Sequence, residues 1–155
     1  MSRSARLLLT AVGVFLLQWL VLGRLRLYGT YPDAVMLFLT WYALHEGRQR
    51  GTLTGFGLGA AMDVVYGTWG IHMLVKTLVG FTVGSFAVEG RKPLLIQPQQ
   101  ALLGALVIGL LHNGLIVILL ALQTEATNSF LIYGLWLGSA VYTAGVAYVT
   151  SLFMQ

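Results

Sequence analysis

The chain has 155 residues, of which 57% are hydrophobic and only 9% are charged, and it contains no cysteine. These proportions are typical of an integral membrane protein and leave no polar interval long enough for a soluble domain. Disulfides and thiolate catalysis are excluded, and the net charge of +4 comes from Lys and Arg at the ends of apolar segments rather than from a basic face for nucleic acid.

The apolar segments predict an all-α protein with six transmembrane helices in one membrane domain. A spanning helix needs about 20 mostly apolar residues, and it pairs its own backbone groups in lipid. The first segment resembles a signal peptide, but it ends in Gly23-Arg24-Leu25-Arg26 rather than at a small-x-small cleavage site, so we expect a retained span. The predicted spans are about 7–23, 33–45, 51–66, 71–88, 99–122 and 130–153.

Two local signals mark the ends of the central spans. Pro32 and Asp33 open the second span, where the free amides of a helix N-terminus favour a carboxylate. This span is short, and His45, Glu46 and Arg48 follow it in a polar turn. Further on, Gly67-Thr68-Trp69-Gly70 predicts a tight reversal, so the third and fourth spans should form an antiparallel hairpin.

The distribution of basic residues predicts the orientation of the six spans. Cytoplasmic loops carry an excess of Lys and Arg, and this rule places both termini in the cytoplasm. The residues on that side are Arg3, Arg6, Arg48, Arg50, Arg91 and Lys92, against Arg24 and Arg26 on the other.

Glycines recur every four residues along the predicted hairpin, and ionisable residues continue the same series near its turn. This spacing keeps the residues on one helix face, and small residues there let two helix backbones approach closely. The sequence therefore predicts a glycine groove on each helix and a pair between Asp63 and either His72 or Lys76. The residues concerned are Gly55, Gly59 and Asp63 in the third span and His72, Lys76, Gly80 and Gly84 in the fourth.

Asp63 and Lys76 admit three interpretations, because a charge at membrane depth is costly unless it is paired or faces water. The first is a buried ion pair that holds the hairpin together, and this is the role we expect. The second is a site that couples to the movement of a proton or solute. The third is a contact with another subunit.

His112 and Asn113 lie near the middle of the fifth span, where polar side chains need a partner on another helix. No second histidine follows four residues later and that helix has no carboxylate, so a metal site is not expected. A hydrolase dyad of His112 with Ser139 is a weaker hypothesis, because Ser139 lacks a recognisable nucleophile motif.

The stretch from Tyr31 to about Phe86 resembles the MreD family of rod shape-determining proteins. The chain length and the six-span plan also fit this family. The resemblance is carried by Pro32-Asp33, by Glu46-Gly47-Arg48-Gln49-Arg50-Gly51, by Gly55-Phe56-Gly57-Leu58-Gly59 leading to Asp63, and by Gly67-Thr68-Trp69-Gly70-Ile71-His72 followed by Gly80.

This resemblance implies a non-enzymatic protein of the bacterial inner membrane that binds no cofactor and takes part in cell-wall elongation. It also implies an MreC-like single-span partner, together with MreB filaments, a RodA-type glycosyltransferase and its transpeptidase. We therefore expect a scaffold that binds the partner's transmembrane helix, a role that glycine grooves suit because they allow close approach; the sequence does not indicate which helix face receives the partner.

The alternative function follows from the same resemblance. The family is similar in fold to the substrate-binding S components of energy-coupling-factor vitamin transporters. Against a vitamin site, the predicted extracytoplasmic loops are mostly short and show no ring of aromatic and polar residues.

Overall fold

The computed structural model describes residues 3–25, 30–87, 97–124 and 129–153. Within these ranges the chain forms six α-helices, which confirms the predicted all-α fold, and π-helical segments adjoin the first and last of them. The elements are α1 (Arg3–Leu17), η1 (Gln18–Leu22), α2 (Ala34–Glu46), α3 (Arg48–Tyr66), α4 (Ile71–Gly84), α5 (Pro98–Thr124), η2 (Leu131–Gly138) and α6 (Ser139–Leu152).

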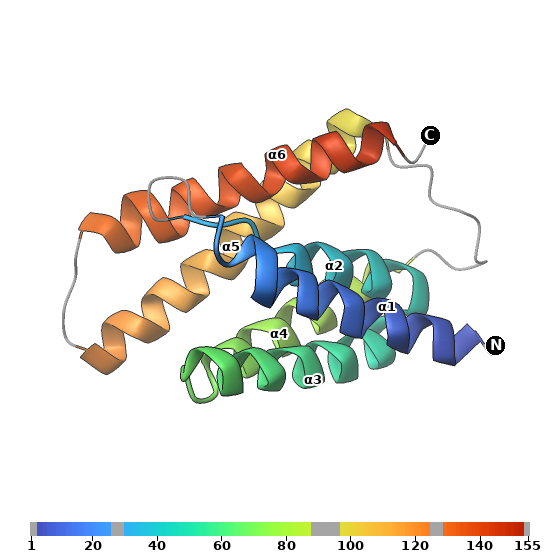
Figure 1. The fold of residues 1–155 in the computed structure, drawn as a ribbon, viewed down its shortest axis with the longest axis horizontal. Coiled ribbons are helices and arrows are strands. Elements are labelled where there is room, and N and C mark those ends of the chain that lie inside the picture. The colour runs from blue at the N-terminus through green and yellow to red at the C-terminus, as the bar shows by residue number, and fades with distance from the viewer. Residues whose placement is uncertain (1–2, 26–29, 88–96, 125–128, 154–155) are drawn as a thin grey trace.

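The helices form two groups, which contact each other mainly through α4 of the first group and α5 of the second (Figure 1). The helices α3 and α4 make the predicted antiparallel hairpin, α2 packs against both of them, and α1 lies along α2. The second group is the antiparallel pair of α5 with η2 and α6. At one end of the molecule, α5 and α6 extend beyond the α3–α4 turn.

The turn between α3 and α4 confirms the predicted reversal. Gly67 and Gly70 have φ angles of 68° and 91°, a region that side chains with a Cβ rarely adopt. The amide of Gly67 donates to the carbonyl of Asp63 and ends α3. Glycine at these two positions therefore allows the chain to reverse within four residues.

The end of α4 differs from the predicted span 71–88, because the helix stops at Gly84. The amides of Phe86 and Ala87 donate to Val83 and Gly84, three residues back, so the last turn is tightened before the chain leaves the helix. Val88 and the basic residues Arg26, Arg91 and Lys92 lie outside the described residues.

The core is formed by small and medium apolar side chains between neighbouring helices. Leu39 and Ala43 of α2 pack against Val79 and Val83 of α4. Between α5 and α6 the buried cluster contains only alanines, namely Ala105, Ala144 and Ala147. Small residues let the helices lie close together, which is how helices associate within lipid.

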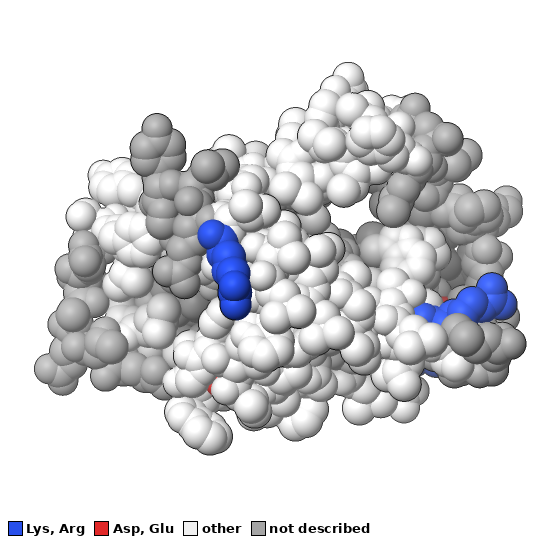
Figure 2. All heavy atoms as spheres, viewed as in Figure 1, with Lys and Arg blue, Asp and Glu red and all other residues white. Residues whose placement is uncertain are grey.

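Many large apolar side chains are exposed on the described part of the protein, and the face drawn in Figure 2 carries few charged residues. Three helical segments are long and apolar enough to cross a membrane, namely Ala5–Leu22, Pro98–Leu122 and Leu131–Leu152. The apolar α4 is shorter, and the 13 residues of α2 span about 20 Å against about 30 Å of hydrocarbon. The protein is therefore an integral membrane protein, and the crossing of the membrane by α2, α3 and α4 stays a prediction.

Candidate functional site

The turn that begins α2 is the centre of the buried polar contacts. Asp33 is the N-cap of α2, and its Oδ1 accepts a hydrogen bond of 2.7 Å from the amide of Met36. This capping geometry satisfies an amide that has no partner within the helix. The prediction that Pro32 and Asp33 mark a helix N-terminus is thus confirmed.

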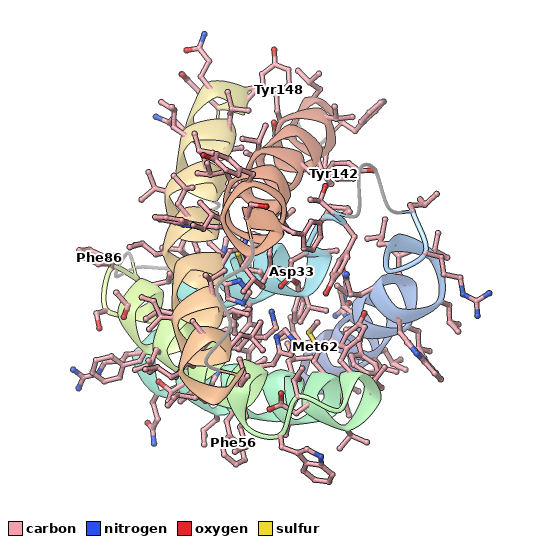
Figure 3. The ribbon with its side chains drawn as sticks, turned by 90° about the vertical axis from the view of Figure 1, so that its left-hand side faces the viewer. Asp33, Phe56, Met62, Phe86, Tyr142 and Tyr148 are labelled. Carbon is pink, nitrogen blue, oxygen red and sulfur yellow. The ribbon has the colours of Figure 1, made fainter. Side chains whose placement is uncertain are left out.

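Asp33 forms an ion pair with Lys76 of α4. Their Oδ2 and Nζ atoms lie 2.6 Å apart, and Lys76 is fully buried while Asp33 is 6% exposed. Two buried charges lose their hydration, and removing either one would leave the other without compensation. This ion pair therefore fixes the start of α2 to the middle of α4. Figure 3 places Asp33 inside the bundle, whereas Phe56, Phe86 and Tyr148 lie on its outside.

His112 of α5 completes a group that we call the polar node, namely Asp33, Lys76 and His112. Its Nε2 lies 3.1 Å from Nζ of Lys76 and 3.7 Å from Oδ2 of Asp33. An ammonium group can only donate, so Nε2 accepts, and Nδ1–H then donates to Oδ1 of Asn113 at 2.9 Å. The predicted need of His112 for a partner on another helix is met by Lys76.

Gln18 at the start of η1 holds the backbone of the same turn. Its Nε2 donates to the carbonyl of Pro32 at 3.0 Å, and its Oε1 accepts from the amide of Ala34 at 2.8 Å. The side chain is only 1% exposed. The sequence prediction missed this residue, although a single amide within an apolar span was an available signal.

Two hydroxyl groups of α6 bind the turn from the opposite side. Ser139 Oγ donates to the carbonyl of Tyr31 at 2.8 Å, and Thr143 Oγ1 accepts from the amide of Asp33 at 3.0 Å. These bonds engage Ser139 with backbone, and both nitrogens of His112 are engaged elsewhere. A Ser139–His112 dyad is therefore not assembled.

Asp63 has a different role from the predicted one. Its carboxylate accepts from Thr68 Oγ1 at 2.7 Å and from the amides of Gly70, His72 and Met73 at 2.9–3.0 Å. The predicted side-chain pair of Asp63 with His72 or Lys76 is wrong, because free amides at the start of α4 lie closer and satisfy the carboxylate. Asp63 closes the hairpin turn, and Lys76 is left to bind Asp33.

The predicted glycine grooves exist, and α3 and α4 use them against each other. A Cβ at Gly55 would lie 2.2 Å from the carbonyl oxygen of Lys76, and one at Gly59 would lie 2.4 Å from that of His72. On α4, Cβ atoms at Gly80 and Gly84 would meet the backbone of α3 at 2.2 Å and 2.6 Å. These faces are therefore occupied within the hairpin and are not open to a partner helix.

A cavity of about 220 Å³ lies beside the polar node. His72 lines it and is 7% exposed, and its Nδ1 has no hydrogen-bond partner among the described residues. Both polar and apolar residues line the cavity. Its walls are Tyr31, Asp33, Met62, Tyr66, Thr68, Ile71, His72, His112, Asn113, Ile116, Leu120, Leu135 and Ser139. In the described part of the chain, no group of three or more His, Cys, Asp or Glu residues could hold a metal ion.

Comparison with known proteins gives one match. The family model for the rod shape-determining protein MreD matches residues 4–155. Comparison with curated proteins found no match, and comparison with solved structures found none either. The family match extends from α1 through α6, well beyond the stretch from Tyr31 to Phe86 that carried the resemblance, and the chain therefore belongs to the MreD family of rod shape-determining proteins.

Proposed function

We propose that the protein is a non-enzymatic scaffold of the bacterial cell-wall elongation machinery and binds an MreC-like single-span partner in the inner membrane. The observation that carries this proposal is the family match over residues 4–155. The partner and the machinery are those that the resemblance implies, with MreB, a RodA-type glycosyltransferase and its transpeptidase as further components. Both termini lie in the cytoplasm, as the basic residues predict.

The chemistry of the buried groups supports a scaffold. Lys76 is bonded to both Asp33 and His112, and Asp63 is bonded to backbone amides and Thr68. Each of these contacts ties one helix to another or closes a turn. Groups that neutralise one another in this way contribute to the arrangement of the helices rather than to the activation of a substrate.

The exposed faces of α1 and α5 are the surfaces best suited to a partner helix. Only 6% of the residues in the Ala5–Leu22 segment are buried, and the others are exposed or partly exposed. On α5, Leu103, Leu111 and Leu122 are 60%, 63% and 74% exposed. Because the glycine faces of α3 and α4 are filled, a transmembrane partner would pack against these leucine-rich faces instead.

Affinity purification of the tagged protein from its native membranes in mild detergent tests the proposal. We expect a stoichiometric single-span companion with a large extracytoplasmic domain. Recovery of ABC ATPases with a coupling membrane subunit would establish the S-component alternative instead, although the cavity of about 220 Å³ lies below the roughly 300–1,000 Å³ of most small-molecule sites. Recovery of neither companion would contradict the scaffold role.

Site-directed crosslinking can then locate the contact, because the chain has no cysteine of its own. Leu111→Cys places a thiol on the outward face of α5, and Ala144→Cys places one in the buried α5–α6 contact. A partner helix on α5 predicts crosslinks from position 111 and none from position 144. Equal crosslinking from both positions would contradict this placement.

A further inference from the structure

The cavity beside the polar node has the features of a built binding site. Its volume of about 220 Å³ equals that of about seven molecules of liquid water, so it exceeds a packing defect. Dry cavities in proteins are lined by apolar groups, whereas this lining also contains polar groups, among them His72, Asn113 and Ser139. The cavity therefore takes an occupant that makes hydrogen bonds.

His72 supplies an unused hydrogen-bonding atom at this cavity. The residue is 7% exposed, and no described residue bonds its Nδ1. The backbone amide of His72 already binds Asp63, and its ring centroid lies 6.0 Å from that of Tyr66. A buried polar atom without a partner destabilises the protein, and an occupant that bonds Nδ1 would remove this cost.

The rest of the lining defines the chemistry of the occupant. The one carboxylate in the wall, Asp33, is neutralised by Lys76, so the cavity offers no free charge to an ion. The lining also includes apolar residues, among them Met62, Ile116 and Leu135. Water alone would match these apolar residues poorly, whereas a molecule with a polar group on an apolar body suits a lining of both kinds.

We propose that this cavity is a binding site for a small neutral molecule with one hydroxyl group on an apolar body, the hydroxyl donating to Nδ1 of His72. The molecule is smaller than the usual ligands of vitamin size. The site is separate from the leucine-rich outer faces, so binding is a property of the purified chain alone and does not depend on a partner protein.

The test uses 4-fluorophenol as the probe and fluorobenzene, which lacks the hydroxyl, as its control. Fluorine NMR of the purified protein in detergent measures the binding of each compound. We expect saturable binding of 4-fluorophenol that is about tenfold tighter than that of fluorobenzene, since one hydrogen bond to a buried acceptor separates the two compounds. Absence of saturable binding, or equal affinity for the two compounds, would overturn the proposal.

Two variants locate the binding. His72→Phe removes Nδ1, and Leu135→Phe narrows the cavity from η2, a segment without buried residues. Each should weaken 4-fluorophenol binding by about tenfold or more. His45→Phe, at the far end of α2, should leave it unchanged. If His72→Phe fails to fold, Leu135→Phe alone tests whether the probe binds in the cavity. Normal 4-fluorophenol binding by a folded Leu135→Phe protein would show that the probe binds elsewhere and would overturn the proposal.

Discussion

Asp33 and Asp63 are both buried carboxylates that bind amides at the start of a helix, but their other partners come from different distances along the chain. The carboxylate of Asp63 accepts hydrogen bonds from four residues, all within ten positions along the chain, in the turn and the beginning of α4. Asp33 is paired with Lys76, 43 residues away, and its amide binds Thr143, 110 residues away. One carboxylate therefore closes the hairpin, and the other ties the hairpin to the rest of the bundle.

The largest effect should come from Lys76→Met, which leaves the charge of Asp33 buried without its partner. We expect a loss of about 3–5 kcal/mol in the free energy of unfolding, measured by thermal or denaturant unfolding in detergent. Arg50→Met breaks the ion pair with Glu46, in which Arg50 is 62% exposed, and should cost about 1 kcal/mol or less. Equal losses in the free energy of unfolding for the two variants would contradict the expectation that a buried ion pair matters more for stability than an exposed one.

The close contact between Gly55 of α3 and the backbone of Lys76 holds α4 against α3. In Gly55→Ala the new Cβ would meet the carbonyl of Lys76, and we expect a loss of about 1–3 kcal/mol. Gly57→Ala on the same helix meets nothing within 4 Å and should stabilise the protein by up to about 1 kcal/mol. Helix propensity favours alanine at both positions. A loss of stability in Gly57→Ala as large as that in Gly55→Ala would therefore contradict the assignment of the loss to the contact with Lys76.

Asp63→Ala should have a smaller effect than Lys76→Met. It removes the cap of α4 but leaves no unpaired charge, so we expect a loss of about 0.5–2 kcal/mol. Asp63→Asn keeps one acceptor oxygen and should fall between the native protein and Asp63→Ala in unfolding experiments. A loss in Asp63→Ala that equals the loss in Lys76→Met would mean that Asp63 carries a second, long-range contact.

The smallest effect should come from a residue outside both regions. Leu111 is 63% exposed on the outward face of α5, and Leu111→Ala should change the free energy of unfolding of the isolated protein by no more than about 0.5 kcal/mol. The same variant should weaken recovery of the partner in affinity purification. Normal recovery would place the partner on another face.

Local features of this fold could be predicted from the sequence because neighbouring residues determine them. Asp33 caps the helix that follows it. Gly67 and Gly70 adopt positive φ angles, and they reverse the chain at the position where the sequence predicted a turn. The glycine period of four also predicted the close contact of α3 and α4, since it places the small residues on one face of each helix.

The pairing of the buried charges could not be predicted in the same way. The spacing of Asp63 and Lys76 suggested a pair, but backbone amides at the start of α4 are nearer to Asp63. Lys76 binds Asp33 only because α2, α4 and α5 meet at one point, which no local pattern specifies. Gln18 and Thr143 were missed for the same reason, as their partners lie on distant segments.

The most direct test of a scaffold role is whether the polar node can be replaced by neutral groups without loss of function. The double variant Asp33→Asn with Lys76→Met keeps the cap acceptor of α2 and removes both charges, and such replacement of a buried pair is often nearly neutral for stability. It should be expressed in cells that lack their own copy of the gene, with protein level and cell shape measured together. If the protein is a scaffold, we expect the double variant to reach the native protein level and to give rod-shaped cells. Rounded cells that contain the folded double variant would contradict this account, because the charges of Asp33 and Lys76 would then be needed for function and not only for the fold.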